Sequence, residues 1–218
     1  MFRPGKDKGI ATPIPLGLAA LGVSTFLMGL ALIAQPAAAW ETYFTNALMM
    51  GGLAEFIAGM WAFAYGDPLA ATVFSFVGAF YGWWGMNGLM VHGAALVPAS
   101  LALVFIVCGV VVLCMWVASF NETAVFNLTL LFLWIADILM GIALAADVRT
   151  LAIIGGISAL ISGVIAAYGS FAELYNAASL EEVVPLGEPK VIRERSEHEE
   201  QERLRRLHAV VDHQAMHV

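Results

Sequence analysis

Two carboxylic acids, Glu55 and Asp137, lie within long apolar stretches of the sequence. No Lys or Arg occurs between Ile10 and Ala146, so neither acid has a basic partner in these stretches. An ionised carboxylate at the centre of a bilayer costs roughly 2.5–3.5 kcal/mol even on the most lenient insertion scale. We therefore expect both side chains to be protonated or to border a hydrated path. Because ionisable groups within a membrane are typical of proton and ion pathways, Glu55 and Asp137 are candidate proton carriers.

Glycines accompany both acids at helical spacing. Gly51 and Gly59 stand four residues before and four residues after Glu55, and Gly141 stands four residues after Asp137. Positions four apart share one face of a helix, and small residues on that face let two helices approach closely. Both acids are therefore expected to face protein and not lipid.

A structural role is an equally good interpretation of the two acids. A neutral carboxylic acid can hydrogen-bond to a neighbouring helix, and Asn46, Asn127 and Thr129 are available partners. The sequence leaves these two interpretations open.

The composition is that of an integral membrane protein. Of the 218 residues 61% are hydrophobic and only 12% are charged, too few to cover a soluble domain. Six apolar runs are long enough to cross a bilayer as helices, and they lack the alternating polarity of barrel strands. The runs cover approximately residues 15–34, 42–65, 68–86, 98–119, 124–145 and 150–175. The predicted fold is therefore all-α, a bundle of six transmembrane helices.

The positions of the basic residues predict how this bundle is oriented in the membrane. Three precede the first run, six follow the last, and only Arg149 lies in a loop between runs. The positive-inside rule then places both termini in the cytoplasm, for a protein of the cell membrane. We expect a cytoplasmic segment at 1–14, a transmembrane domain at 15–176 and a charged cytoplasmic tail at 177–218. A signal peptide is the alternative for the first run, but its length and its three glycines favour a retained helix.

Small residues recur every four positions in two of the runs. The longer stripe consists of Gly155, Ala159, Gly163 and Ala167, and the shorter one of Gly78 and Gly82. Such stripes are typical of tightly packed membrane helices, and a pore lining is a second, compatible use.

The residue pattern indicates no reaction chemistry, so we expect no enzyme, cofactor, metal or nucleic-acid partner. Cys108 and Cys114 stand about 120° apart around one helix, too far for a disulfide, and fit small apolar packing residues. His208, His213 and His217 lie in the polar tail without other metal ligands nearby.

Transport is the functional class that remains for a helix bundle whose loops are this short. A site for a permanent anion needs an Arg or a helix N-terminus, whereas a small weak acid can cross with its proton. A channel for a small neutral solute such as urea, an amide, ammonia or water is the first alternative. A non-transporting sensor or scaffold that acts through the charged tail is the second.

Four short motifs occur in order between Thr12 and Glu188. They read TPIPLGL at 12–18, GGLAE at 51–55 with AGMW at 58–61, NLT at 127–129, and a block at 163–176 followed by VPLG at 184–187. Together they resemble the motifs of the acetate uptake transporters, also called succinate–acetate permeases.

This resemblance implies a six-helix protomer within a homohexamer, each protomer having its own path for acetate and related short carboxylates. It implies a pore constriction at Leu21, Val77 and Leu128, where only Leu128 keeps the family's residue type and two aromatic residues have become aliphatic. It places the substrate path along Leu16, Gly17, Glu55, Asn127, Thr129 and Ala166. Glu55 replaces the family's usual Gln, which favours proton coupling through this residue.

Overall fold

The computed structural model describes residues 9–34, 39–91, 98–179 and 183–187, and within them the chain is helical. The helices are α1 (Ile14–Ala34), α2 (Ala39–Asn46), a π-helix (Ala47–Ala54), α3 (Glu55–Tyr65), α4 (Pro68–Val91), α5 (Pro98–Ala118), a 3-10 turn (Ser119–Asn121), α6 (Ala124–Ala146) and α7 (Arg149–Ser179). Because α2, the π-helix and α3 continue one another, these elements make six candidate membrane spans. The predicted six-helix membrane fold is confirmed. The charged tail beyond 187, with His208, His213 and His217, lies outside the described residues.

Short turns join the helices where the sequence has cap residues. Gly66 ends α3 in the left-handed region with φ of 92°. The Asp67 carboxylate then accepts a hydrogen bond of 2.9 Å from the backbone N–H of Ala70 and so caps α4. Thr123 caps α6 through the N–H of Phe126, and Asp147 ends α6 with φ of 52°. The apolar runs at 42–65 and 68–86 are therefore joined by a tight turn.

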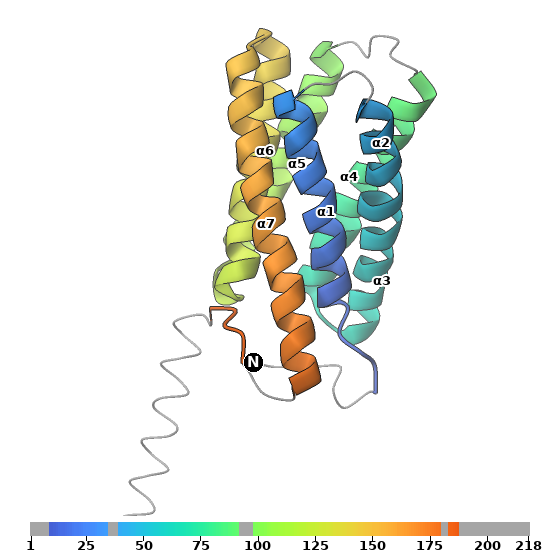
Figure 1. The fold of residues 1–218 in the computed structure, drawn as a ribbon, viewed down its shortest axis with the longest axis vertical. Helices are drawn as coiled ribbons and strands as arrows, with labels where there is room; N and C mark the ends of the chain where they lie inside the picture. The colour runs from blue at the N-terminus through green and yellow to red at the C-terminus, as the bar shows by residue number, and fades with distance from the viewer. Residues whose placement is uncertain (1–8, 35–38, 92–97, 180–182, 188–218) are drawn as a thin grey trace, which may run out of the picture.

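Helix α1 lies at the centre of the bundle (Figure 1), between α7 on one side and the α2–α3 span with α4 on the other. Helices α5, α6 and α7 pack in sequence order on the first side. Although α4 and α5 are consecutive, their backbones approach each other at few places, and the rings of Phe80 and Trp84 on α4 bridge the gap to Phe105 on α5. The bundle therefore has two halves that α1 connects, with a crevice along the boundary of α4 with α5 and α6.

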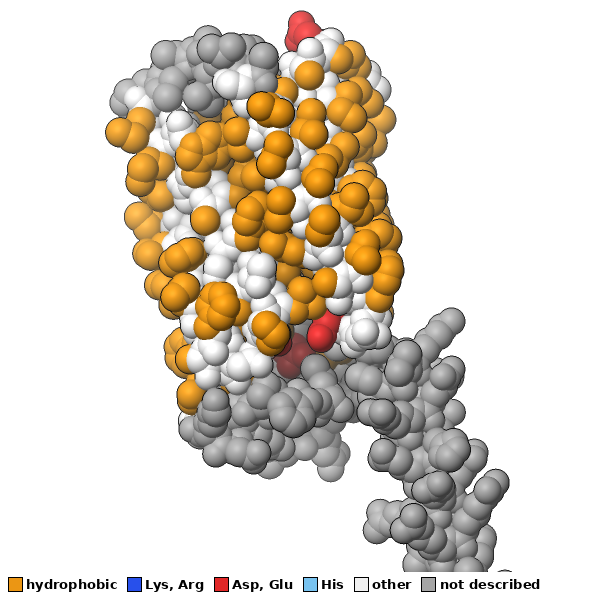
Figure 2. Space-filling model, turned by 180° about the vertical axis from the view of Figure 1, so that it is seen from behind, with side chains coloured by type: hydrophobic (Ala, Val, Ile, Leu, Met, Phe, Trp, Pro, Cys, Tyr) orange, Lys and Arg blue, Asp and Glu red, His pale blue; other side chains and the backbone are white. Residues whose placement is uncertain are grey.

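The flanks of the bundle are apolar (Figure 2), as a lipid-facing surface requires. Side chains such as Leu103 and Val107 of α5 and Phe171 and Leu174 of α7 are more than half exposed. Arg149 is the only Lys or Arg in the described part of the chain. The side chains thus give the protein a hydrophobic belt along its helices.

A short segment after α7, residues 183–187, folds back onto the bundle. The side-chain oxygen of Asn176 accepts hydrogen bonds from the N–H groups of Val183 and Val184, at 2.9 and 2.8 Å. The carbonyl oxygens of Leu186 and Gly187 in turn accept the N–H groups of Val125 and Ala124. This segment therefore satisfies backbone donors in the first turn of α6, which would otherwise lack partners.

Glycines set the distance between α1 and α7. A Cβ atom on Gly29 would lie 2.5 Å from the Gly156 oxygen and 2.9 Å from the Leu160 nitrogen, and one on Gly22 would lie 3.0 Å from the Gly163 oxygen. These are backbone atoms that cannot move without separating the helices. Gly82 differs, since its Cβ would meet the Gly52 Cα at an ordinary 3.5 Å. The predicted tight packing therefore holds for Gly163, whereas Gly82 has room for a methyl group.

We expect Gly29→Ala to lower the melting temperature of the detergent-solubilised protein by several degrees, since overpacking costs about 1–3 kcal/mol. Gly82→Ala is the matched control and should melt within about one degree of the wild type. Thermal unfolding monitored by tryptophan fluorescence measures both. Equal stability of the two variants would contradict the role assigned to the α1–α7 contact.

Candidate functional site

Buried apolar side chains pack together in the half of the bundle toward the chain termini, and we call this cluster the neck. It is formed by buried side chains of α1, α4 and α6, namely Leu18, Leu21, Phe74, Val77, Phe126, Leu130 and Leu133. The rings of Phe74 and Phe126 meet edge to face with centroids 6.1 Å apart. Gly17 of α1 faces the Phe74 ring so closely that a Cβ atom there would overlap it. The absence of a side chain at Gly17 thus makes room for the ring.

The structure brings together two of the three residues proposed as the constriction. Leu21 and Val77 are buried in the neck, at 1% and 3% exposure. Leu128 is 40% exposed, and it stands two residues from both Phe126 and Leu130, about 200° around α6. In this structure Leu128 thus points away from Leu21 and Val77, whereas Phe126 and Leu130 point into the neck, and a constriction that includes Leu128 stays a prediction.

Phe74 and Phe126 lie in the neck, but neither was predicted as a site residue from the sequence. Phe74 stands one helical turn before Val77, and this spacing was the one available signal for it. Phe126 has no comparable signal, because its inward orientation depends on how α6 is rotated against its neighbours.

The proposed path residue Asn127 is occupied by structural contacts. Its side-chain oxygen accepts the indole N–H of Trp116 at 3.2 Å, and its amide donates to the Ser119 hydroxyl at 2.8 Å. These bonds fasten the end of α5 to the start of α6. Asn127 therefore has no free polar group to offer a passing solute.

Three other proposed path residues lie at helix contacts or on the outside. The Thr129 hydroxyl bonds to the Val125 carbonyl of its own helix. Ala166 is fully buried and packs against Gly22, between α7 and α1. Leu16 is 42% exposed near the start of α1. Of the proposed path residues, only Gly17 and Glu55 face the interior of the bundle between α1 and α4.

Glu55 is fully buried, and neither of its carboxyl oxygens has a hydrogen-bond partner among the described residues. It stands at the junction of the π-helix with α3. Gly51, one turn earlier on the same face, lies so close to α1 and α4 that a Cβ atom there would be 2.7 Å from Tyr81 and 2.9 Å from the Ser24 oxygen. The predicted orientation of Glu55 toward protein is confirmed, and π-helical segments often occur at functional sites.

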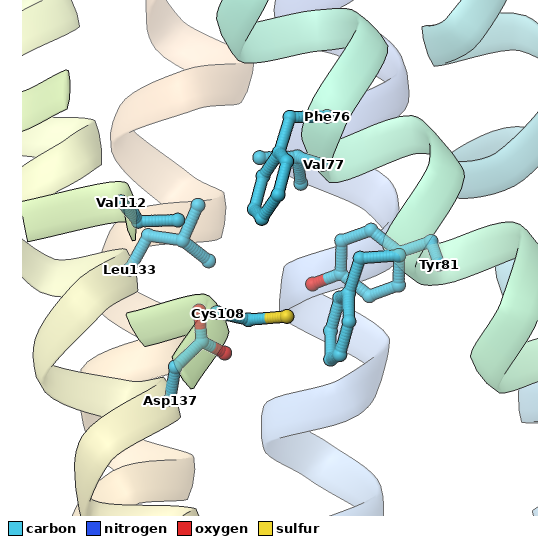
Figure 3. Close-up of a pocket in the computed structure, with 8 residues that line it drawn as sticks. Phe76, Val77, Tyr81, Cys108, Val112, Leu133 and Asp137 are labelled. Atoms are coloured by element: carbon cyan, nitrogen blue, oxygen red, sulfur yellow. The ribbon is translucent and has the colours of Figure 1, made fainter. Parts of the chain in front are cut away.

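Asp137 lines the crevice between α4, α5 and α6 (Figure 3). The surrounding side chains are Phe76, Val77, Phe80, Tyr81, Cys108, Val112 and Leu133. Asp137 is 3% exposed, and its Oδ1 atom has no partner among the described residues. The crevice is nowhere wide enough for a water molecule. Both predicted acids are therefore buried with unpaired oxygens, and neither bonds to Asn46, Asn127 or Thr129 within the described structure.

An acidic pocket lies below the neck, at the end of the bundle near the termini. Asp67, Glu122 and Glu173 line it together with apolar side chains that include Phe126, and its cavity volume is about 40 Å³. Burial raises the pKa of Glu122 above its ordinary value of 4.5, and the negative charge of Asp67 raises it further. This pocket would repel a carboxylate ion more strongly than a neutral acid.

Comparisons with known proteins point to one group. The family model described as the GPR1/FUN34/yaaH family matches residues 2–186. The structure of the bacterial acetate channel SatP is similar with a TM-score of 0.77 and 25% identity, over 82% of this chain and 99% of that one. Acetate permease A of Emericella nidulans is 36% identical over 90 residues, which are 37% of this chain. The chain covers only 29% of the length of that permease.

We expect Glu122→Gln to stabilise the protein at neutral pH, by on the order of 2 °C in melting temperature. A raised pKa means that the folded state binds more protons than the unfolded state above pH 4.5, so wild-type stability falls as the pH rises. The gain should vanish near pH 4, where Glu122 is neutral. Asp147→Asn, which removes one exposed carboxylate at the other end of the bundle, is the control, and thermal melts from pH 4 to 8 measure both. A gain that persists at pH 4 would contradict this explanation.

Proposed function

Because the chain belongs to the GPR1/FUN34/yaaH family, we propose that it moves acetate or a related short-chain carboxylate across a membrane. The observation that carries the proposal is the likeness to the acetate channel SatP, which extends over 82% of this chain and nearly all of the other. The chain is a multi-pass membrane protein with six candidate spans. We propose that it is not an enzyme.

The interior of the bundle favours the neutral form of the substrate. From α1 to α6 no Lys or Arg stands inside a span, so a carboxylate ion would cross the neck without a compensating charge. A carboxylic acid that carries its proton avoids most of this desolvation penalty. The apolar neck and the acidic pocket below it support passage of acetic acid, or of acetate together with a proton.

Glu55 and Asp137 are the groups we propose to handle that proton. Both are buried, and both have carboxyl oxygens without partners in the described structure. A carboxyl in this state can accept or release a proton without breaking an existing hydrogen bond. We propose further that the protein lies in the cell membrane with both termini in the cytoplasm, in agreement with its basic residues at both ends. The homohexamer implied by the family resemblance is also a proposal.

Uptake of labelled acetate by proteoliposomes tests this function. Formate, propionate and succinate should be compared with urea as competitors at equal concentration. We expect the monocarboxylates to inhibit acetate uptake and urea to leave it unchanged. Uptake of urea with no uptake of acetate would instead support a channel for a neutral solute.

We expect Glu55→Gln to lose most of the stimulation that an inward proton gradient gives to acetate uptake, because the amide cannot exchange a proton. Exchange of labelled acetate without a gradient should continue within about twofold of the wild type. Asp147→Asn, an exposed carboxylate outside the spans, is the control and should keep the full stimulation. Unchanged stimulation in Glu55→Gln would remove Glu55 from the proton pathway.

A further inference from the structure

Residues 183–187, which we call the strap, are fastened to α7 by side chains of that helix. The amide of Asn176, a buried residue, donates to the Val184 carbonyl at 2.8 Å, and its oxygen accepts two N–H groups of the strap. The Tyr168 hydroxyl donates to the Pro185 carbonyl at 2.8 Å. Four hydrogen bonds thus hold this short segment against the C-terminal part of α7.

The strap in turn holds the first turn of α6. Its last two carbonyl oxygens accept the N–H groups of Ala124 and Val125, at 2.7 and 3.2 Å. The N–H of the next residue, Phe126, donates to the Thr123 side chain. The side chains of Leu186 and Val125 belong to one buried cluster. The backbone that carries Phe126 is therefore fixed by the strap together with the helix cap.

The ring of Phe126 stands at the boundary between two hollows of the bundle. On α4 the acidic pocket is lined as far as Ala70 and the crevice from Phe76 onward, and Phe74 lies between them. On α6 the pocket is lined as far as Phe126 and the crevice from Leu133 onward. The rings of Phe74 and Phe126 meet edge to face with centroids 6.1 Å apart. This ring contact therefore separates the acidic pocket from the crevice.

We propose that the strap holds Phe126 against Phe74, and that this ring contact limits the size of the carboxylic acid that the protein transports. The inference rests on the proposed function, because it concerns an acid on its way between the pocket and the crevice. Phe126 is then a residue that the passing acid touches, and Asn176 is a positioning residue that acts through the strap. Neither belongs to the three constriction residues that the family resemblance implies.

The packing around the two rings explains why the strap matters for size. Two rings in contact leave room for an acid only when one of them turns aside. The backbone of Gly17 lies against the Phe74 ring and limits its movement. While the backbone of Phe126 is fixed, its ring can turn only about its side-chain bonds, so the opening stays small. A frayed first turn of α6 would let the whole residue move away and would widen the opening.

A purely structural role of the strap is the alternative. Carbonyl groups that bond to the first turn of a helix stabilise it whatever side chains the helix carries. In that case loss of the Asn176 side chain lowers the melting temperature, but it leaves the preference for small acids unchanged. The preference between a large and a small acid therefore distinguishes the two roles.

The test compares uptake of labelled acetate and labelled 3-hydroxybutyrate by proteoliposomes, after subtraction of the flux into protein-free liposomes. The second acid is larger, and its hydroxyl group slows its passage through lipid. We expect Phe126→Ala and Asn176→Ala to raise the uptake of 3-hydroxybutyrate relative to acetate at least about fivefold over the wild type. The matched controls should keep the wild-type ratio. They are Phe63→Ala, which removes an exposed ring of α3, and Asn87→Ala, whose side chain bonds to the Trp83 carbonyl of its own helix.

Hydrogen exchange measured by mass spectrometry gives an independent readout of the strap. In Asn176→Ala the amides of Ala124 and Val125 should exchange at least about tenfold faster, because the strap no longer protects them. Tyr168→Phe removes only one of the four bonds, so it should raise the exchange and the uptake ratio less than Asn176→Ala does. Tyr175→Phe, at a similarly exposed tyrosine of the same helix, is its control.

The outcomes separate this inference from the proposed function. A wild type that transports no acetate would overturn the proposed function and the inference with it. A wild type that transports acetate, together with an unchanged ratio in Phe126→Ala, would overturn the size limit alone. A raised ratio in Phe126→Ala but not in Asn176→Ala would overturn the role of the strap. If either alanine variant fails to fold, Phe126→Leu and Tyr168→Phe take their places, and an unchanged ratio in them counts against the proposal in the same way.

Discussion

The structure depends on one electrostatic constraint: a carboxylate inside this bundle has no positive charge to balance it. From the start of α1 to the end of α6, no span contains a lysine or an arginine. The same constraint acts on the protein's own acids and on an acidic substrate. Ionised carboxylates are strongly disfavoured in such surroundings, whereas a carboxylic acid that keeps its proton is tolerated. The proton is thus the natural counterion for any carboxylate that crosses the bundle.

The interior divides into two parts along the membrane normal. Toward the chain termini, Leu21, Phe74 and Phe126 are buried in the apolar neck. Asp137 stands eleven residues beyond Phe126, which is about 16 Å further along α6. Tyr81 and Ser24 meet Gly51, which stands one helical turn before Glu55, and side-chain oxygens of Ser24, Glu55 and Tyr81 have no hydrogen-bond partner among the described residues. The interior thus combines apolar packing with a few buried carboxyl and hydroxyl groups.

Sequence reasoning could predict what depends on composition and local spacing. Run lengths predicted the six spans, and the glycines around Glu55 indicated its burial. The ends of the spans were less accurate, since α4 continues to Val91 and α7 begins at Arg149.

The side of a helix on which a motif residue lies could not be predicted in the same way. The motif at 127–129 places Leu128 at the right depth, but the rotation of α6 directs it outward. Asn127 carries a polar side chain, yet Trp116, eleven residues earlier, occupies it. Such orientations depend on contacts between helices, and a motif spacing holds no information about those contacts. Phe126 belongs to the neck for the same reason, through its contact with Phe74, a residue that is distant in sequence.

A measurement of the net charge that crosses the membrane with each acetate tests most directly whether acetate crosses together with a proton. Proteoliposomes with a fixed proton gradient can be clamped with potassium and valinomycin at zero, inside-positive or inside-negative potential. The initial rate of labelled acetate uptake is measured at each potential. The flux into protein-free liposomes is subtracted before the rates are compared. The account predicts the same rate at all three potentials, because each acetate crosses with one proton. Uptake that rises with an inside-positive potential would show that the bare carboxylate ion passes the neck, and it would contradict the account.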